Sequence, residues 1–225
     1  MFSVIFEVLP DKGKKDDYLG LAKHLKPILE GIDGFIDNER FESRSRPGWV
    51  LSHSTWRDEK SVIRLRTQAK HHEIQKKGRF EVFSDYHLRV GEITDDTHPP
   101  MGVPVREQRF DTTEVGTSKL CTIVELVPHE GTELPKGEDE MLQAIRLDRG
   151  APGLNEVQVY DSIYTPGKVL VLGSWAEPEA AEAFRPGEVP GAQTIRRRAV
   201  RIIRDYGMFD RRETPQYYPD VDRKS

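Results

Sequence analysis

Two histidines have the residue type and the placement for acid–base chemistry, because imidazole changes charge near neutral pH. His72 follows Val62, Leu65 and Ala69 at intervals of three, four and three residues. This spacing puts the four side chains on one face of a helix, so the ring of His72 is predicted to point toward the sheet that the helix covers. A base facing a cavity and a hydrogen-bonded core histidine both fit this placement. His71 lies roughly 100° around the same helix and is predicted to be solvated.

His53 is informative because the chain contains two copies of its surroundings. The strand ending at Trp56 returns 119 positions later as a strand ending at Trp175, and there the position of His53 is occupied by Leu172. An imidazole buried without a partner would cost about 1–3 kcal/mol, so His53 should have a hydrogen bond or a pocket. A functional site confined to the first copy and a histidine between two packed sheets are both consistent with this difference.

Other side chains could bind a ligand or make structural ion pairs. Glu7 recurs as Glu125, and an interior carboxylate is either paired with an arginine or raised in pKa. The candidate partners are Arg40, Arg89 and Arg201. Structural pairing is the favoured interpretation of these carboxylates.

Trp56 recurs as Trp175, which favours a structural role at the corner between strand and helix, although an indole can also form the wall of an aromatic ligand's site. Asn38 and Tyr86 are further candidate hydrogen-bond donors to a ligand.

The composition narrows the class of protein. Hydrophobic residues make up 36% and charged residues 32% of the 225 positions, as in a soluble globular protein. The net charge of −4 favours neither nucleic acid nor an anionic membrane as a partner. A lone cysteine, Cys121, excludes an intramolecular disulfide and is predicted to be buried. With no apolar run near the roughly 18 residues of a membrane span and no signal-peptide pattern, we expect a cytoplasmic protein.

The first half of the chain has the pattern β-α-β-β-α-β. Strand-like alternation, helical periodicity and turn residues predict strands near 3–9, 35–43, 49–56 and 84–93, with helices at 16–30 and 59–77. The second half repeats the Pro10, Gly34, Pro47-Gly48 and Trp56 positions at offsets of 118 or 119. We therefore predict a domain at 1–93, a proline-containing linker at 94–118, and a degenerate second repeat with a C-terminal tail at 119–225.

A β-α-β-β-α-β unit is the ferredoxin-like arrangement, whose helices cover only one face of the sheet. The other face needs a partner, which a tandem copy supplies. The predicted fold class is α+β, with two ferredoxin-like repeats packed sheet to sheet as an α+β barrel.

Residues 2–93 resemble a known family. A helix leading into Ile32-Asp33-Gly34-Phe35, a strand ending in Ser54-Thr55-Trp56-Arg57-Asp58-Glu59, and a helix carrying Ala69-Lys70-His71-His72 are similar to the antibiotic-biosynthesis monooxygenase domain of the dimeric α+β barrel superfamily. Relatives in that superfamily include cofactor-free oxygenases of phenols, heme-degrading enzymes and quinone-handling enzymes.

The resemblance implies a monooxygenase-like enzyme that oxidises a small aromatic or phenolic compound with O2. Such chemistry needs an apolar cavity, a base such as His53 or His72, and a donor such as Arg40 or Asn38 for the oxyanion. It requires no metal and no flavin, and the sequence contains neither motif. Trp56, Asn38, Glu7 and Tyr86 are the candidate substrate-binding residues.

Two alternatives remain open at this point. The same superfamily implies heme binding with His72 as axial ligand, although Glu7 stands where the heme-degrading relatives have an asparagine. The other alternative is a non-catalytic protein that binds a small hydrophobic ligand or assembles with partners. A homo-oligomer is compatible with both.

Overall fold

The computed structural model describes residues 1–223, and its first half follows the predicted order of strands and helices. Its elements are β1 (Phe2–Pro10), α1 (Lys15–Glu30), β2 (Phe35–Ser43), β3 (Val50–Trp56), α2 (Glu59–Arg66), α3 (Ala69–Lys77), a π-helical turn at Gly78–Val82, and β4 (Phe83–Asp96). The second half repeats this order with shorter helices. It comprises β5 (Leu120–Pro128), α4 (Glu138–Ala144), β6 (Leu154–Ser162), β7 (Val169–Trp175), α5 (Pro178–Ala183) and β8 (Ala192–Gly207).

The eight strands of the described chain form one closed barrel in the order β1-β3-β2-β6-β7-β5-β8-β4. Each half contributes four neighbouring strands, and the halves join at two seams. The β2–β6 seam is short, from Phe41–Ser162 to Ser43–Tyr160, whereas β4 pairs with β8 from His87–Gly207 to Asp96–Arg198. The predicted α+β barrel of two repeats is confirmed, and because the edges of the two sheets pair, no strand edge is left open.

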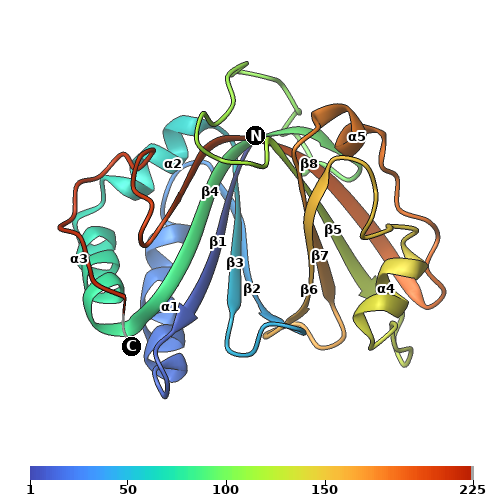
Figure 1. Ribbon diagram of the computed structural model, residues 1–225, viewed down its shortest axis with the longest axis horizontal. Coiled ribbons are helices and arrows are strands. Elements are labelled where there is room, and N and C mark those ends of the chain that lie inside the picture. Colours follow the sequence, from blue (N-terminus) through green and yellow to red (C-terminus); the bar gives the residue numbers. More distant parts are fainter. Residues whose placement is uncertain (224–225) are drawn as a thin grey trace.

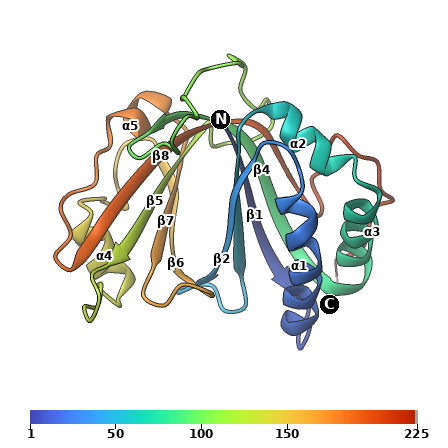
Figure 2. The ribbon, with the colours of Figure 1, turned by 180° about the vertical axis from the view of Figure 1, so that it is seen from behind.

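The helices lie outside the barrel on opposite sides. Helices α1, α2 and α3 cover the first-half strands, and α4 and α5 cover the second-half strands (Figures 1 and 2). Strand β1 has the predicted alternation: Phe6 and Val8 pack with residues of α1, whereas Ile5 joins the apolar cluster inside the barrel.

Equivalent glycines set the geometry of both copies. Gly34 and Gly153 each have a positive φ, of 91° and 75°. A Cβ at Gly34 would lie 2.0 Å from Ser61 Oγ, and one at Gly153 would lie 2.7 Å from the Cβ of Glu177. Both turns therefore need glycine for conformation and for space where the following strand packs against the start of a helix.

The second predicted helix differs from expectation because it is two helices. Helix α2 ends at Arg66, and the hydroxyl of the C-cap residue Thr67 donates to the backbone oxygens of Ile63 and Arg64. Gln68 then adopts an extended conformation, with ψ of 122°, before α3 begins. This interruption changes which residues of α3 face the sheet.

The two halves differ in how well their helices fill the outer face of the barrel. In the second half, Met141, Leu142 and Ala181 from the helices pack with strand residues such as Val171 and Trp175 in one buried cluster. The corresponding space in the first half is not filled in this way, and a cavity lies there.

Residues 97–119, most of the predicted linker, form no helix or strand. The proposed division at 93 and 118 stays a prediction, since the strands of both halves share one barrel. Cys121 is buried, as predicted. No helix within residues 1–223 has both the length and the apolar character needed to span a membrane.

Candidate functional site

A cavity of about 200 Å³ lies between the first-half strands and helices α1, α2 and α3. Its walls are mainly apolar. They include Val4 and Phe6 from β1, Leu21, Leu25 and Leu29 from α1, Val62 and Leu65 from α2, Ile74 from α3, and Phe83, Leu88 and Val90 from β4. An engineered cavity of about 150 Å³ holds benzene, so this space suits a small molecule of about one ring with a short substituent.

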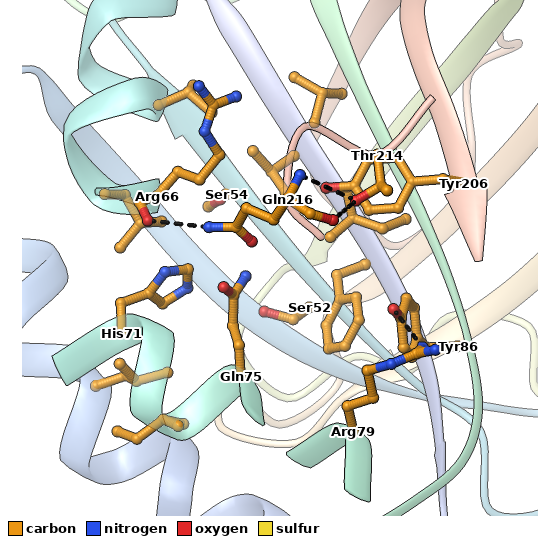
Figure 3. Close-up of a pocket in the computed structure, with 18 of the residues that line it drawn as sticks. Ser52, Ser54, Arg66, His71, Gln75, Arg79, Tyr86, Tyr206, Thr214 and Gln216 are labelled. Carbon is orange, nitrogen blue, oxygen red and sulfur yellow. Dashed lines mark hydrogen bonds between the residues drawn. The ribbon is translucent and has the colours of Figure 1, made fainter. Parts of the chain in front are cut away.

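The C-terminal tail, residues 208–219, closes the cavity. After leaving β8 in the second half, it crosses back over the helices of the first half (Figure 1). Gln216 donates to the backbone oxygen of Arg66 at 3.2 Å, and Arg79 donates to the backbone oxygen of Pro219 at 3.2 Å. Residues from both ends of the chain therefore line one site (Figure 3).

Five arginines line the cavity, and none makes a salt bridge to an acidic side chain within residues 1–223. They are Arg40, Arg66, Arg79, Arg204 and Arg211. The carboxylate that lines the cavity, Glu59, is already paired with Arg109 at 2.8 Å.

Two of these arginines are deeply buried: Arg40 is 7% exposed and Arg79 is 2% exposed. Their hydrogen-bond partners are neutral. Arg40 donates to Asn38 Oδ1 at 3.0 Å, and Arg79 donates to Tyr86 Oη at 3.2 Å and to the backbone oxygen of Met208 at 2.8 Å. The site thus has excess positive charge in an apolar setting.

Several polar side chains lie around Arg40. Asn38 donates to Ser52 Oγ at 3.1 Å and to the backbone oxygen of His53 at 2.9 Å, which fixes the amide. The Tyr18 hydroxyl, also in the lining, is buried without a geometric hydrogen bond among the described residues. Burial raises the pKa of Tyr18, although Arg40 opposes the shift, so this phenol stays protonated at neutral pH.

His71 and Gln75 line the cavity from α3, and Figure 3 shows both side chains directed into it. His71 Nδ1 and Gln75 Oε1 are buried and have no hydrogen-bond partner in the described part of the chain. Burial lowers the pKa of His71 to about 4, with a further contribution from the neighbouring His72, while the backbone of Leu65 opposes the shift. The ring is therefore neutral at physiological pH.

The predicted orientation of His72 is wrong. His72 is exposed, its Nδ1 lies 3.0 Å from Tyr218 Oη, and its ring stacks on Tyr218 with centroids 5.3 Å apart. The prediction assumed one continuous helix from residue 59, whereas the extended Gln68 resets the helical phase and turns His71 inward instead.

His53 lies inside the barrel, separated from the cavity by the sheet. Its Nε2 is 2.9 Å from Ser3 Oγ, and its Nδ1 is 3.7 Å from Glu125 Oε1. Burial lowers its pKa well below the usual value, and nearby Arg198 adds to the shift. His53 thus occupies the interface between the two sheets, one of the two placements that the sequence left open.

Glu7 also lies inside the barrel, in an ion-pair network. Its carboxylate contacts Arg89 and Arg46 and accepts a hydrogen bond from Tyr160 Oη at 2.6 Å. Burial alone would raise its pKa, but the two arginines hold the pKa at about 2. Of the predicted partners, Arg89 is correct, whereas Arg40 lines the cavity and Arg201 pairs with Glu92 and Glu107.

The other predicted binding residues divide between cavity and core. Asn38, Arg40 and Tyr86 line the cavity, whereas Trp56 is fully buried and does not. Trp56 Nε1 donates to Ser54 Oγ at 2.9 Å, and Trp175 Nε1 donates to Thr122 Oγ1 at 3.0 Å. Each indole thus has a matched structural contact.

Sequence reasoning missed His71, Gln75, Arg79, Arg211 and Tyr218 as members of the site. No local pattern signals the interruption that orients His71. The tail residues Arg211 and Tyr218 lie more than 180 positions from α1 in the chain, and only the tertiary structure brings them there.

Comparison with known proteins agrees with the fold. Residues 1–77 match the family described as "Antibiotic biosynthesis monooxygenase". A curated relative from Pyricularia oryzae strain 70-15, named "Jasmonate monooxygenase ABM", is 42% identical over 225 aligned residues, which cover 97% of this chain and 99% of the relative.

Among solved structures, a putative monooxygenase from Lactobacillus acidophilus NCFM is 8% identical, with a TM-score of 0.40, over 91% of this chain and 94% of its own. An anthrone oxidase-like protein is 14% identical, with a TM-score of 0.35, over 92% of each chain. Neither likeness is close enough to bear on activity. The identity with the full-length relative and the match over residues 1–77 show that the chain belongs to the antibiotic biosynthesis monooxygenase family.

Proposed function

We propose that this protein is a monooxygenase whose substrate is a small, mostly apolar carboxylate of the jasmonate class, bound in the cavity beneath α1, α2 and α3. The observation that carries the proposal is the set of five lining arginines that have no acidic partner among residues 1–223. A guanidinium buried without a counter-charge is unfavourable, and an anionic ligand supplies that charge.

The substrate class follows from combining charge with shape. Arginine binds a carboxylate through two parallel hydrogen bonds, which orients the ligand as well as holding it. The apolar walls suit a ring and a hydrocarbon chain. Jasmonate, a cyclopentanone that bears a carboxylate and a short chain, has these features, and the 42% identical relative carries its name.

An aromatic or phenolic substrate is the second candidate. Phe6, Phe83 and Tyr86 contact one another at centroid distances of 5.7–6.3 Å and line one side of the cavity. Such a wall suits a flat ring, and a phenolate would use the same arginines.

In the proposed chemistry, neither metal nor flavin is needed. A substrate with an acidic C–H loses a proton, and the resulting anion reacts with O2. Arg40, oriented by Asn38 at 3.0 Å, is the proposed donor to the substrate oxyanion. The substrate itself supplies the electrons.

Heme does not fit the residues present. The proposed axial ligand, His72, is exposed and already contacts Tyr218. The cavity of about 200 Å³ is only slightly larger than the ~150 Å³ that encloses one benzene ring, and it is too small for a porphyrin.

Calorimetric titration with jasmonate tests the proposal, together with O2 uptake and mass spectrometry of the product. We expect saturable binding and a product that contains one added oxygen atom. Arg40→Met should weaken binding by about 30-fold, because a hydrogen bond from a buried charged group to the substrate oxygen contributes about 2 kcal/mol.

The matched control is Arg64→Met, since Arg64 is exposed, pairs with Asp33 and does not line the cavity. The control should bind jasmonate like the wild type. The proposal would be contradicted if neither jasmonate nor any of a panel of phenols bound to the protein. Binding without O2 uptake would support the non-catalytic alternative.

A further inference from the structure

His71 and Gln75 are one helical turn apart on α3, so both face the same part of the cavity. Figure 3 shows them next to each other, directed toward Gln216 and Ser52. Both belong to the lining, and each carries a buried polar atom, Nδ1 or Oε1, without a partner in residues 1–223. Each such atom costs about 1–3 kcal/mol, which favours a ligand group that contacts them.

The protonation state of His71 suits a proton acceptor. Its pKa of about 4 keeps the ring unprotonated at neutral pH. A neutral imidazole has one nitrogen free to accept a proton. Gln75 Oε1 can only accept a hydrogen bond, so it is suited to receive one from the ring once Nδ1 is protonated.

We propose that His71 is the catalytic base that removes a proton from the carbon beside the substrate carbonyl, and that Gln75 is a positioning residue for the protonated ring. This inference rests on the proposed function, because it assumes that a jasmonate-like ketone occupies the cavity. It assigns the base to a residue that lines the cavity rather than to His53 or His72.

The proton and electron balance is complete with O2 as the oxidant. The C–H bond breaks, the proton goes to His71 Nδ1, and the electron pair remains on the substrate as an enolate that Arg40 stabilises. The enolate carbon bonds to O2, and the peroxide formed takes the proton back from His71. Loss of water from this hydroperoxide converts the original CH2 into C=O. The carbon loses four electrons, and O2 gains four as one carbonyl oxygen and one water.

Proton removal can be measured separately from oxygen chemistry. With O2 excluded and D2O as solvent, the wild type should speed deuterium incorporation at the carbons beside the jasmonate ketone, followed by NMR. His71→Asn should lower this exchange rate by about 100-fold, the low end of general-base effects. Binding of jasmonate, measured by calorimetry, should stay within about threefold of wild type.

Four further variants make the test specific. His72→Asn is the matched control and should exchange like the wild type at saturating jasmonate, because His72 is exposed and lies outside the lining. Added imidazole should restore part of the exchange in His71→Ala. Gln75→Met should exchange about tenfold more slowly at saturating jasmonate, and Gln75→Glu, which keeps an acceptor oxygen, should recover the rate.

Two results would overturn the assignment. Exchange that persists in His71→Asn would place the base elsewhere, and so would a wild type that binds and oxidises jasmonate without anaerobic exchange. A wild type that does not bind jasmonate at all would instead overturn the proposed function, and this assignment with it.

Discussion

Single residues divide between two environments that the sheet separates. The barrel interior contains ion pairs such as Glu7 with Arg89, in which each charge has a partner. The cavity on the outer face contains guanidiniums, such as that of Arg40, that have no acidic partner in the described part of the chain. A buried charge with its partner is structural, whereas a buried charge without one favours a ligand of opposite sign. This contrast separates structural residues from candidate site residues better than residue type does.

His53→Leu is a prediction at the residue scale. Leu172 occupies the equivalent position in the second copy, which shows that the barrel accommodates leucine in this setting. We expect this variant to keep jasmonate binding and O2 uptake within about twofold of wild type, because His53 lies across the sheet from the cavity. A large loss of turnover in a folded His53→Leu variant would return His53 to the site.

The same variant should change how stability depends on pH. The folded-state pKa of His53 lies well below 6.5, so the unfolded chain binds a proton that the folded chain does not. The wild type therefore loses stability as pH falls below about 6.5, by up to about 2 kcal/mol at pH 5 from this residue. Urea unfolding at pH 7 and pH 5 should show a smaller loss in His53→Leu than in the wild type.

At the scale of elements, the interruption between α2 and α3 and the C-terminal tail build the site. Gln68 turns His71 toward the sheet, and the tail brings Arg211 and Tyr218 over the opening. Glu213 helps to hold the C-terminal tail in place. Its carboxylate accepts hydrogen bonds from Thr113 Oγ1 at 2.7 Å and from the backbone N–H of Asp205 at 2.7 Å.

Tyr218→Ala tests the tail as a cover for the cavity. Tyr218 lines the cavity and stacks on His72 with an interplanar angle of 19°. Its removal should speed jasmonate release and raise the dissociation constant about tenfold, the equivalent of about 1.4 kcal/mol. Stopped-flow measurement of release gives this rate. Tyr217→Ala is the control, since Tyr217 is 90% exposed, and equal effects in both variants would count against the tail as a cover.

At the scale of the whole molecule, the closed barrel makes the two halves interdependent. Strand β4 pairs with β8 over most of its length, and Arg89 in the first half donates to Ser174 in the second at 2.7 Å. The second copy pairs with the edge strands of the first copy and covers the sheet face that the first-half helices leave bare.

Residues 1–96 expressed alone should therefore self-associate. This fragment would expose the edges of β2 and β4 and the apolar interior face that includes Ile5, Leu51 and Ile93. Light scattering after size-exclusion chromatography should give oligomers or aggregates, with the intact chain at equal concentration as the comparison. A folded, monomeric fragment would show that the seams contribute little.

The sequence by itself determined the repeat, the order of strands and helices, and the α+β barrel. These depend on local signals that both copies carry: alternation along strands, turn glycines such as Gly34, and the tryptophan at each strand end. The cost of burying an unpaired carboxylate also predicted that Glu7 would be paired with an arginine inside the barrel. Arg40, Asn38 and Tyr86 were identified as candidates and do line the cavity.

Only the tertiary structure decided which candidates share a site. A strand places alternate residues on opposite faces, so His53 and the cavity-lining Ser52 are neighbours in sequence and lie on opposite sides of the sheet. One extended residue, Gln68, exchanged the orientations of His71 and His72, because each residue advances a helix by roughly 100°. The tail residues reached the cavity through closure of the barrel, which depends on pairing between strands far apart in the chain and leaves no local signature.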